Sequence, residues 1–221
     1  MKRFSIEADE ARVKKLYKFE DKRRAEGFKL IAGVDEAGRG SLVGALVVAA
    51  VILPDDLYLA RLDDSKKLSA KVREQLYDEI TDAAISWNAV RVEVEEIDTL
   101  NIYQATLQGM KRAVEGLDVQ PDFVLTDAMH VEFDGIKSLS IVHGDSLSAS
   151  IAAASIIAKV TRDRLADKWA LQYPGYGFEH NRGYGTAEHL AAIDRLGASP
   201  IHRQSFNPVK SLVNFVGGKI S

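Results

Sequence analysis

The sequence predicts an α/β fold in which helices cover both faces of a mixed five-stranded sheet. Five short segments rich in Val, Ile, Leu and Ala are typical of strands, and longer segments carry apolar residues at helical spacing. The first strands follow one another closely, whereas the later ones alternate with helices. The 221 residues suit one domain with an appendage. We expect a basic helical extension at 1–29 and a core domain at 30–221.

The extension is expected to form one charged helix that ends near Gly27. It holds ten basic and six acidic side chains, and Val13, Leu16 and Tyr17 form a modest apolar stripe. It contains no apolar stretch typical of a secretory signal, and the longest apolar run of the chain, Leu42–Leu53, is too short to cross a bilayer as a helix. We therefore expect a cytoplasmic protein with no membrane association.

The core domain is expected to begin with a hairpin. Leu30–Val34 is a short buried strand, and the Val- and Ala-rich segment Leu46–Leu53 is a second strand that Pro54 ends. The polar turn Asp35-Glu36-Ala37-Gly38-Arg39-Gly40 follows the first strand. The two strands are close enough in sequence to pair.

The rest of the core alternates helices and strands. Ser69 is expected to cap a helix, and the final helix is apolar nearly all round over Ile151–Ala158, which predicts a central position. The expected elements are a helix with the inner face Val72, Leu76, Ile80 and Ala83, a half-exposed strand through Val90, Val92 and Val94, a helix over Asn101–Gly116, strands over Phe123–Thr126 and Leu139–Val142, and a helix from about Ser146 to Lys168.

Four acidic residues stand at or just beyond the ends of apolar strands: Asp35, Glu36, Asp127 and Asp145. An unpaired carboxylate beside a buried core costs several kcal/mol, so something should compensate it. Because the chain has no cysteine, a metal must be held by oxygen or imidazole ligands. Two divalent cations would neutralise the cluster, and oxygen ligands favour Mg²⁺ or Mn²⁺.

Each acid also has an ordinary structural interpretation. Asp145 could cap the long helix, Asp127 could begin an Asx turn, and Asp35 with Glu36 could form a solvated turn. The coincidence of all four weakens this interpretation. Since consecutive strand residues point to opposite faces, Asp35 and Glu36 can share a site only if the chain kinks, which Gly38 and Gly40 make feasible.

Charge is distributed unevenly along the chain. The net charge of −3 combines −11 over residues 30–158 with +4 at each end. This pattern suits an acidic metal centre flanked by phosphate-binding surface, and it equally suits scattered solvated charge.

The turn Gly33–Gly40 resembles the first motif of ribonuclease HII, the bacterial type 2 ribonuclease H. Further blocks match this family in the same order, over about residues 30 to 210. They are Asp64–Ser69, Thr126-Asp127, Gly144-Asp145-Ser146 with Ser150–Asp163, Tyr173-Pro174, Gly183–Thr186 and His202–Phe206. Departures from the pattern occur at Ser41, Ala45, Ala128 and His143, and none removes an expected metal ligand.

The resemblance implies a ribonuclease H-like fold and an endoribonuclease acting on RNA/DNA hybrids and on duplex DNA with embedded single ribonucleotides. Asp35, Glu36, Asp127 and Asp145 would be both catalytic residues and ligands of two divalent ions, Mn²⁺ or Mg²⁺. One ion would activate the attacking water and the other would stabilise the leaving 3′ oxygen, which gives 5′-phosphate and 3′-hydroxyl ends. The enzyme is expected to be a monomer that cuts 5′ to the single ribonucleotide.

Substrate contacts are also implied by the resemblance. The turn Gly38-Arg39-Gly40 would sense the ribose 2′-hydroxyl, because glycines let main-chain groups approach a sugar closely. Tyr184 would stack on the sugar at the RNA-to-DNA junction, although a rigid packed aromatic is the alternative. Basic side chains are candidate phosphate ligands. They are Lys66, Lys159, Arg162 and, with a solvated face as the favoured alternative, Lys67.

Two other functions remain open at this stage. One is another nuclease or polynucleotidyl transferase of the ribonuclease H-like superfamily, against which the blocks at Asp64–Ser69 and Gly183–Thr186 argue. The other is a non-catalytic hybrid-binding protein, which would not need four metal-ready acids. The histidines lack a helix-face metal spacing and are interpreted as surface or packing residues, with His202 and Arg203 anchoring the last segment. Val216–Ser221 shows no motif.

Overall fold

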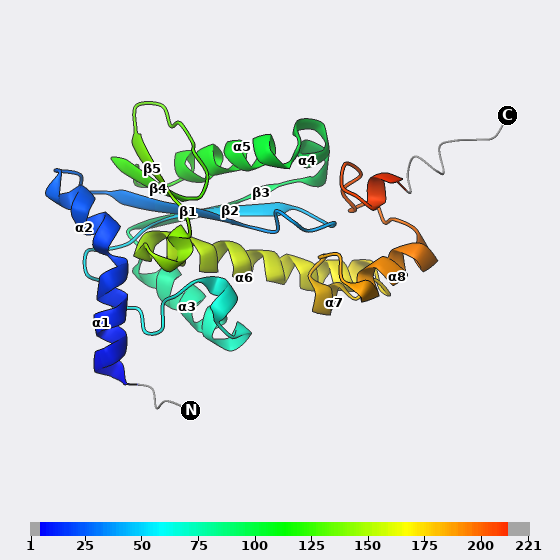
Figure 1. Ribbon diagram of the computed structural model, residues 1–221, viewed down its shortest axis with the longest axis horizontal. Coiled ribbons are helices and arrows are strands. Elements are labelled where there is room, and N and C mark those ends of the chain that lie inside the picture. Colours follow the sequence, from blue (N-terminus) through cyan, green and yellow to red (C-terminus); the bar gives the residue numbers. More distant parts are fainter. Residues whose placement is uncertain (1–4, 212–221) are drawn as a thin grey trace.

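The computed structural model describes residues 5–211 and contains the predicted mixed five-stranded sheet (Figure 1). The strand order is β3-β2-β1-β4-β5, with β1, β2 and β3 antiparallel and β4 and β5 parallel to β1. The strands are β1 Ile31–Ala37, β2 Leu46–Ile52, β3 Ser86–Val92, β4 Phe123–Asp127 and β5 Lys137–Ile141. The predicted hairpin of the first two strands is confirmed.

Helices cover both faces of the sheet, as Figure 1 shows. Because side chains alternate along a strand, Val47, Ala49 and Val51 of β2 face the layer of α3 (Ala70–Ala83) and α6 (Ala149–Gln172). Their neighbours Leu46, Val48 and Ala50 face α5 (Ile102–Glu115) instead, next to the short α4 (Val94–Leu100). This arrangement gives the molecule two apolar layers, one on each side of a fully buried strand.

The central helix α6 crosses β1 at very close range. A Cβ atom at Gly33 would collide with the main chain of Ser150, so only glycine permits this approach. The residues Ile151–Ala158 are almost completely buried, which confirms the predicted central position of this helix. The close crossing brings the segment before α6 to the end of β1.

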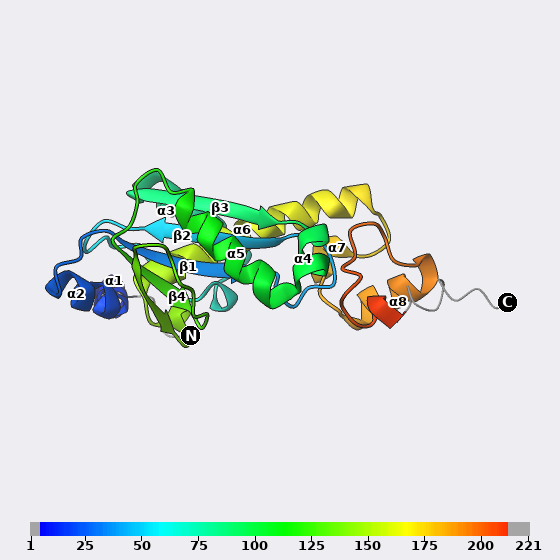
Figure 2. The same ribbon diagram turned by 90° about the horizontal axis from the view of Figure 1, so that it is seen from above.

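A small C-terminal lobe extends beyond the sheet, and Figure 2 shows it at the far end of α6. It consists of α7 (Phe178–Asn181), α8 (Ala187–Leu196) and the segment that follows them. Arg203 is fully buried and donates hydrogen bonds to the carbonyls of Gly44 and Arg39, and His202 is buried beside it. The predicted anchoring of the last segment by these two residues is confirmed.

Four boundary predictions were wrong. The extension forms two helices, α1 (Ile6–Leu16) and α2 (Lys18–Ala25), because the chain turns at Tyr17, whose ring is buried against the core. Val94 begins α4 instead of extending the third strand. The long helix starts at Ala149, since Gly144–Ser146 forms a separate 3-10 turn, η2. β1 continues to Ala37, through the residues expected to form a turn.

None of the helices in the described part of the chain has the length and apolar character needed to cross a bilayer.

Candidate active site

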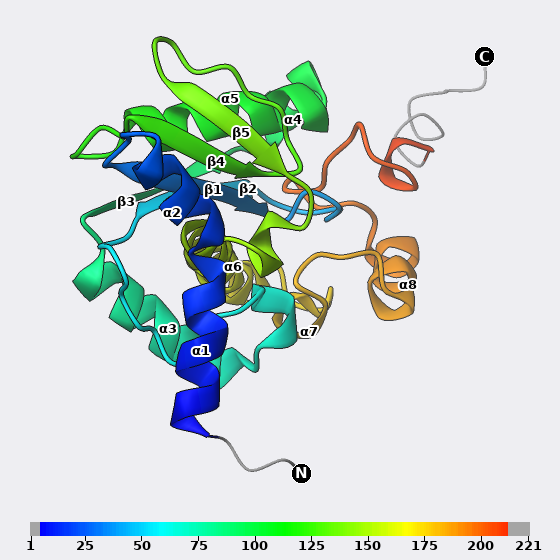
Figure 3. The same cartoon turned by 60° about the vertical axis from the view of Figure 1, so that its left-hand side comes forward.

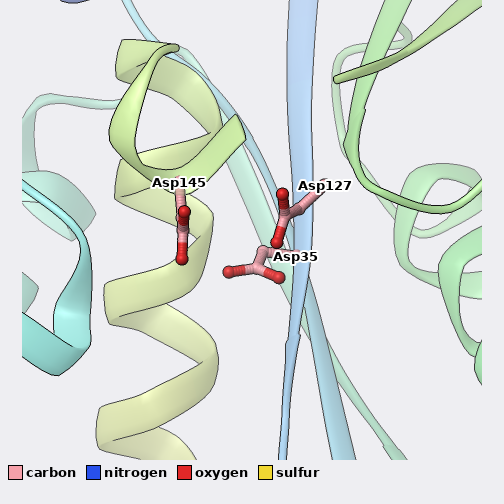
Figure 4. A group of neighbouring side chains, drawn as sticks. All are labelled: Asp35, Asp127 and Asp145. Atoms are coloured by element: carbon pink, nitrogen blue, oxygen red, sulfur yellow. The ribbon is translucent and has the colours of Figure 1, made fainter. Parts of the chain in front are cut away.

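Asp35, Asp127 and Asp145 converge at one point of the structure. Each offers a carboxylate oxygen, and these oxygens lie within 4.8 Å of one another (Figure 4). Asp35 lies on β1 and Asp127 is the last residue of the adjacent parallel strand β4, whereas Asp145 lies in η2, just before α6. The cluster therefore forms where two neighbouring strands and the start of the central helix meet.

Main-chain hydrogen bonds hold the cluster together. The Gly144 N–H donates to Asp127 Oδ1 at 2.7 Å, which ties the end of β4 to η2. The Glu36 N–H donates to Asp35 Oδ1, also at 2.7 Å. Asp35 and Asp145 are only 5% and 4% exposed, so two of the three carboxylates lie largely out of water.

Glu36 lies beside this cluster and is not one of its three members. β1 stays paired with β2 through Ala37, so the kink that would turn both acids to one face does not occur. Asp35 lies opposite Ala49 on the α6 face, and Glu36 lies opposite Val48 on the α5 face. Glu36 nevertheless lines the same pocket, and its Oε2 atom is buried without a hydrogen-bond partner in the described chain. It reaches the site from the other face of the strand.

The acids of this site lie close together with little solvent, so their charged forms are unfavourable. Burial raises the pKa of Asp35 well above its ordinary value, and the charges of Glu36 and Asp127 raise it further. Burial also raises the pKa of Glu36 to about 7, against the lowering effect of Arg39, and it raises the pKa of Asp127. Such a cluster is stabilised by cations, because the carboxylates repel one another and lack solvent.

Lys66 is the ammonium group that contacts the cluster directly. Its Nζ lies 3.1 Å from Asp145 Oδ2, although its side chain is 74% exposed. Burial lowers the pKa of Lys66, but the hydrogen bond to Asp145 and the charges of nearby acids together outweigh this effect, so the pKa is raised. One exposed ammonium group does not neutralise three aspartates, which leaves room for divalent ions.

A pocket of about 470 Å³ opens over Asp35, Glu36 and Asp127. It brings together residues from β1, the turn after it, η1 (Ser65–Lys67), α6 and the loop before α8. Its lining includes six of the predicted substrate contacts and leaves out Lys67 and Arg162. The six are Gly38, Arg39, Gly40, Lys66, Lys159 and Tyr184. Tyr184 is 37% exposed there. Lys159 donates to Asp163 at 2.6 Å, and burial lowers its pKa.

Arg162 lies behind the pocket lining, so this structure does not place it for the direct phosphate contact that the sequence predicted. Its side chain is fully buried and donates to the carbonyls of Val43, Ala45 and Arg182. Its guanidinium also lies 5.4 Å from the centre of the Tyr184 ring. Arg162 therefore supports the walls of the pocket from behind. The signal in the sequence was its place on the buried face of α6, where Ser155, Ala158, Arg162 and Ala166 follow one another at helical spacing.

Two pocket residues were missed by the sequence reasoning. Ser65 and Ser155 line the pocket, and the Ser155 hydroxyl donates to Ser65 Oγ at 2.7 Å. This bond fixes η1, which carries Lys66, against α6. Neither Ser155, a small hydroxyl side chain on an apolar helix, nor Ser65 in η1 gave an indication of that role in the sequence.

Comparison with known proteins relates this chain to one family. A family model described as Ribonuclease HII matches residues 32–209, beginning after both N-terminal helices. Ribonuclease HII of Bacillus licheniformis is 53% identical over 193 residues, which cover 87% of this chain and 75% of the relative. Ribonuclease HII of Enterococcus faecalis is 50% identical over 200 residues, which cover 90% and 78%.

Solved structures show the same fold. The ribonuclease H2 of Pyrococcus horikoshii OT3 superposes with a TM-score of 0.73 at 24% identity, covering 86% of this chain and all of that one. The structure of the PCNA:RNase HII complex from Archaeoglobus fulgidus gives a TM-score of 0.65 at 25% identity, with 81% and 96% covered. The mixed sheet with helices on both faces is therefore an architecture that these proteins share.

Proposed function

The chain belongs to the ribonuclease HII family and is a metal-dependent endoribonuclease, and on that premise we propose which bonds it cuts. The substrates are the RNA strand of RNA/DNA hybrids and single ribonucleotides embedded in duplex DNA, with cleavage 5′ to the ribonucleotide. The products carry 5′-phosphate and 3′-hydroxyl ends. The enzyme acts as a cytoplasmic monomer in this proposal.

Asp35, Glu36, Asp127 and Asp145 form the catalytic, metal-binding set in this proposal. The convergence of the three aspartates is the observation that carries it. The donor set fits hard cations such as Mn²⁺ or Mg²⁺, because all ligands are oxygens and Glu36 Oε2 is buried without a partner in the described chain. Two such ions, when bound, supply the Lewis acidity that activates water and stabilises the leaving oxygen.

The residues around the acids bind and orient the nucleic acid. The ion pair between Lys66 and Asp145 competes with cation binding, so metal loading would free the exposed Lys66 ammonium for a backbone phosphate. Lys159 lines the same pocket and supplies a second phosphate contact. Lysines suit this task because a hybrid nuclease needs charge complementarity and no base readout.

The turn Gly38-Arg39-Gly40 and Tyr184 select for ribose. Arg203 holds the Arg39 carbonyl at 3.0 Å, so the turn has a defined place at the pocket wall. A Cβ atom at Gly40 would meet no neighbour within 4 Å, which leaves this backbone open to an approaching sugar. Tyr184 lies across the pocket as an exposed aromatic platform for the sugar at the junction.

The test is incubation of the protein with duplex DNA containing one ribonucleotide, with a uniform RNA/DNA hybrid and with DNA duplex alone. We expect cleavage of the first two in Mg²⁺ or Mn²⁺, a 5′-phosphate on the downstream product, and no cleavage with a chelator. Asp127→Asn should be inactive while still folded. Cutting of the DNA duplex, or chelator-resistant cleavage, would contradict the proposal.

A further inference from the structure

Glu20, on α2, makes a buried contact with the start of the central helix. It is 1% exposed, and its Oε1 atom accepts hydrogen bonds from Ser148 Oγ and Ser150 Oγ, each at 2.6 Å, and from Ser150 N at 2.9 Å. Glu20 precedes its partners by 128 and 130 residues. The extension thus places an acid inside the core, at the beginning of α6.

The start of α6 is a favourable place for a carboxylate. The first N–H groups of a helix lack partners within it and carry partial positive charge, which is appreciable for a helix of 24 residues. Ser148 already caps the helix, since its Oγ accepts from Ile151 N. Glu20 is therefore not needed as the cap, and its three hydrogen bonds fix the helix end relative to α2.

The same helix end is connected to the metal-binding acids. The Ser148 N–H donates to the Gly144 carbonyl at 2.8 Å, and the Gly144 N–H donates to Asp127 Oδ1 at 2.7 Å. Asp145 lies between Gly144 and Ser148 in this short turn. A shift of the Glu20 contact would move Ser148 and, with it, the spacing between Asp127 and Asp145.

The N-terminal extension packs against the core, so the position of Glu20 is fixed relative to α6. Val13, Leu16 and Tyr17 belong to the same apolar cluster as the buried residues of α6, and the Tyr17 hydroxyl donates to the Leu57 carbonyl at 2.8 Å. Figures 1 and 3 show α1 and α2 at the end of the molecule where α6 begins, running across the direction of that helix. Their described residues are part of the body that holds the site.

We propose that Glu20 is a positioning residue: it holds the turn before α6 so that Asp145 and Asp127 keep their metal-binding separation. This inference rests on the proposed metal site. It gives the N-terminal helices a role inside the enzyme, in addition to the basic surface that the sequence indicated. Outer residues that orient metal ligands commonly change metal affinity or activity by about 10- to 100-fold when they are altered.

The experiment compares Mn²⁺ binding to the full-length wild type, Glu20→Gln and Asp21→Asn by calorimetry without substrate. Glutamine keeps the size and one acceptor oxygen but removes the charge. Asp21→Asn makes the same charge change on the same helix, where the exposed Asp21 side chain forms an ion pair with Arg24. We expect the Kd for Mn²⁺ to rise about 10-fold or more in Glu20→Gln and to stay unchanged in Asp21→Asn. In the cleavage assay, kcat should fall while KM for the hybrid stays near the wild-type value.

Wild-type Mn²⁺ affinity and kcat in a folded but less heat-stable Glu20→Gln would overturn the positioning role, because Glu20 would then act on stability alone. If the wild type binds no Mn²⁺, the proposed metal site fails as well. If Glu20→Gln does not fold, Ser150→Ala is measured in its place. This variant keeps Glu20 and removes one of its hydrogen-bond donors. It should weaken Mn²⁺ binding by a smaller factor, and an unchanged Kd would then overturn the proposal.

Discussion

Asp35 shows how a side chain can be unfavourable for folding and suitable for metal binding. Burial and three neighbouring acids raise its pKa well above the ordinary value, so in the absence of metal it must be either protonated or charged among like charges. Either state costs free energy relative to the unfolded chain at neutral pH. This is the expected behaviour of a ligand whose partner is a cation.

Asp35→Asn should therefore stabilise the metal-free protein while abolishing cleavage. The amide keeps the oxygen that accepts from Glu36 N and removes the charge, so we expect about 1 kcal/mol of added stability, or roughly 2–4 °C in Tm, in chelator. Binding of uncut hybrid should remain measurable. Thermal unfolding and a gel-shift assay check these outcomes.

A control for this prediction is Asp122→Asn. Asp122 accepts hydrogen bonds from the main-chain N–H groups of Lys29 and Leu30, and its negative charge strengthens these bonds. Removing the charge should therefore lower Tm. A lower Tm in Asp35→Asn as well would show that Asp35 is also a structural residue, contrary to the assignment.

The sequence was informative about acids at strand ends and uninformative about buried charges. Asp35, Asp127 and Asp145 each follow an apolar run, and a carboxylate there demands compensation. Glu20 lies in an ordinary charged helix, and the place of Arg162 on a buried helix face does not reveal its partners. The partners of both residues are more than 100 residues away, apart from the Arg182 carbonyl. Local patterns do not record such long-range contacts.

At the scale of elements, periodicity predicted helices well and their ends less well. Ser69 caps α3, as predicted, whereas Asn101, expected within its helix, caps α5. α4 was missed because Val94 continues the alternation of Val90 and Val92, and its seven residues contain one further buried position, Ile97. An element this short contains too few residues to distinguish helical spacing from the alternation of a strand.

The loop Gly183–Thr186 is held in place by its main chain. Tyr184 N donates to the Asn181 carbonyl at 2.9 Å, and the Tyr184 carbonyl lies 2.9 Å from His189 Nδ1. The ring is therefore presented to the pocket by a supported backbone, with the Arg162 guanidinium over one of its faces. Such a loop can tolerate removal of the ring without collapsing.

Tyr184→Ala should impair cleavage at a lone ribonucleotide more than cleavage of long hybrids. Stacking on an aromatic ring contributes about 1–3 kcal/mol, so we expect an additional loss of roughly 10-fold in kcat/KM on the junction substrate. Tyr184→Phe keeps the stacking surface and should retain the wild-type ratio between the two substrates. Equal losses on both substrates in Tyr184→Ala would argue against the junction role. Steady-state kinetics on the two substrates decides this.

At the scale of the whole molecule, the α/β class and the number of strands were predictable, and the convergence of the site was not. The order of strand types indicated a mixed sheet. Asp35 meets Asp127 because β1 pairs with β4. Asp35 meets Asp145 because α6 crosses β1 closely at Gly33. Those contacts join distant segments, and one sequence specifies them only through packing.

The buried histidine pair of the C-terminal lobe should make the free energy of unfolding depend on pH. His202 Nε2 lies 3.2 Å from His189 Nε2, and Ser199 N donates to His202 Nδ1, so His202 donates to its partner as a neutral ring. Burial and the nearby His189 lower the pKa of His202 to about 4, from 6.5. Between these values the unfolded chain binds more protons than the folded one, and stability falls as pH decreases.

His202→Gln should remove much of this pH dependence. Glutamine can still donate to His189 Nε2 but does not titrate, so the variant should be less stable than the wild type at pH 7.5 and approach it at pH 5. The wild type should lose about 2 kcal/mol over this range through His202. The raised pKa values of Asp35 and Glu36 act with the opposite sign, since those groups stabilise the folded state as pH falls. Because both proteins share these acids, the difference between their urea-unfolding free energies isolates the histidine, and a difference that stays constant with pH would refute its proton linkage.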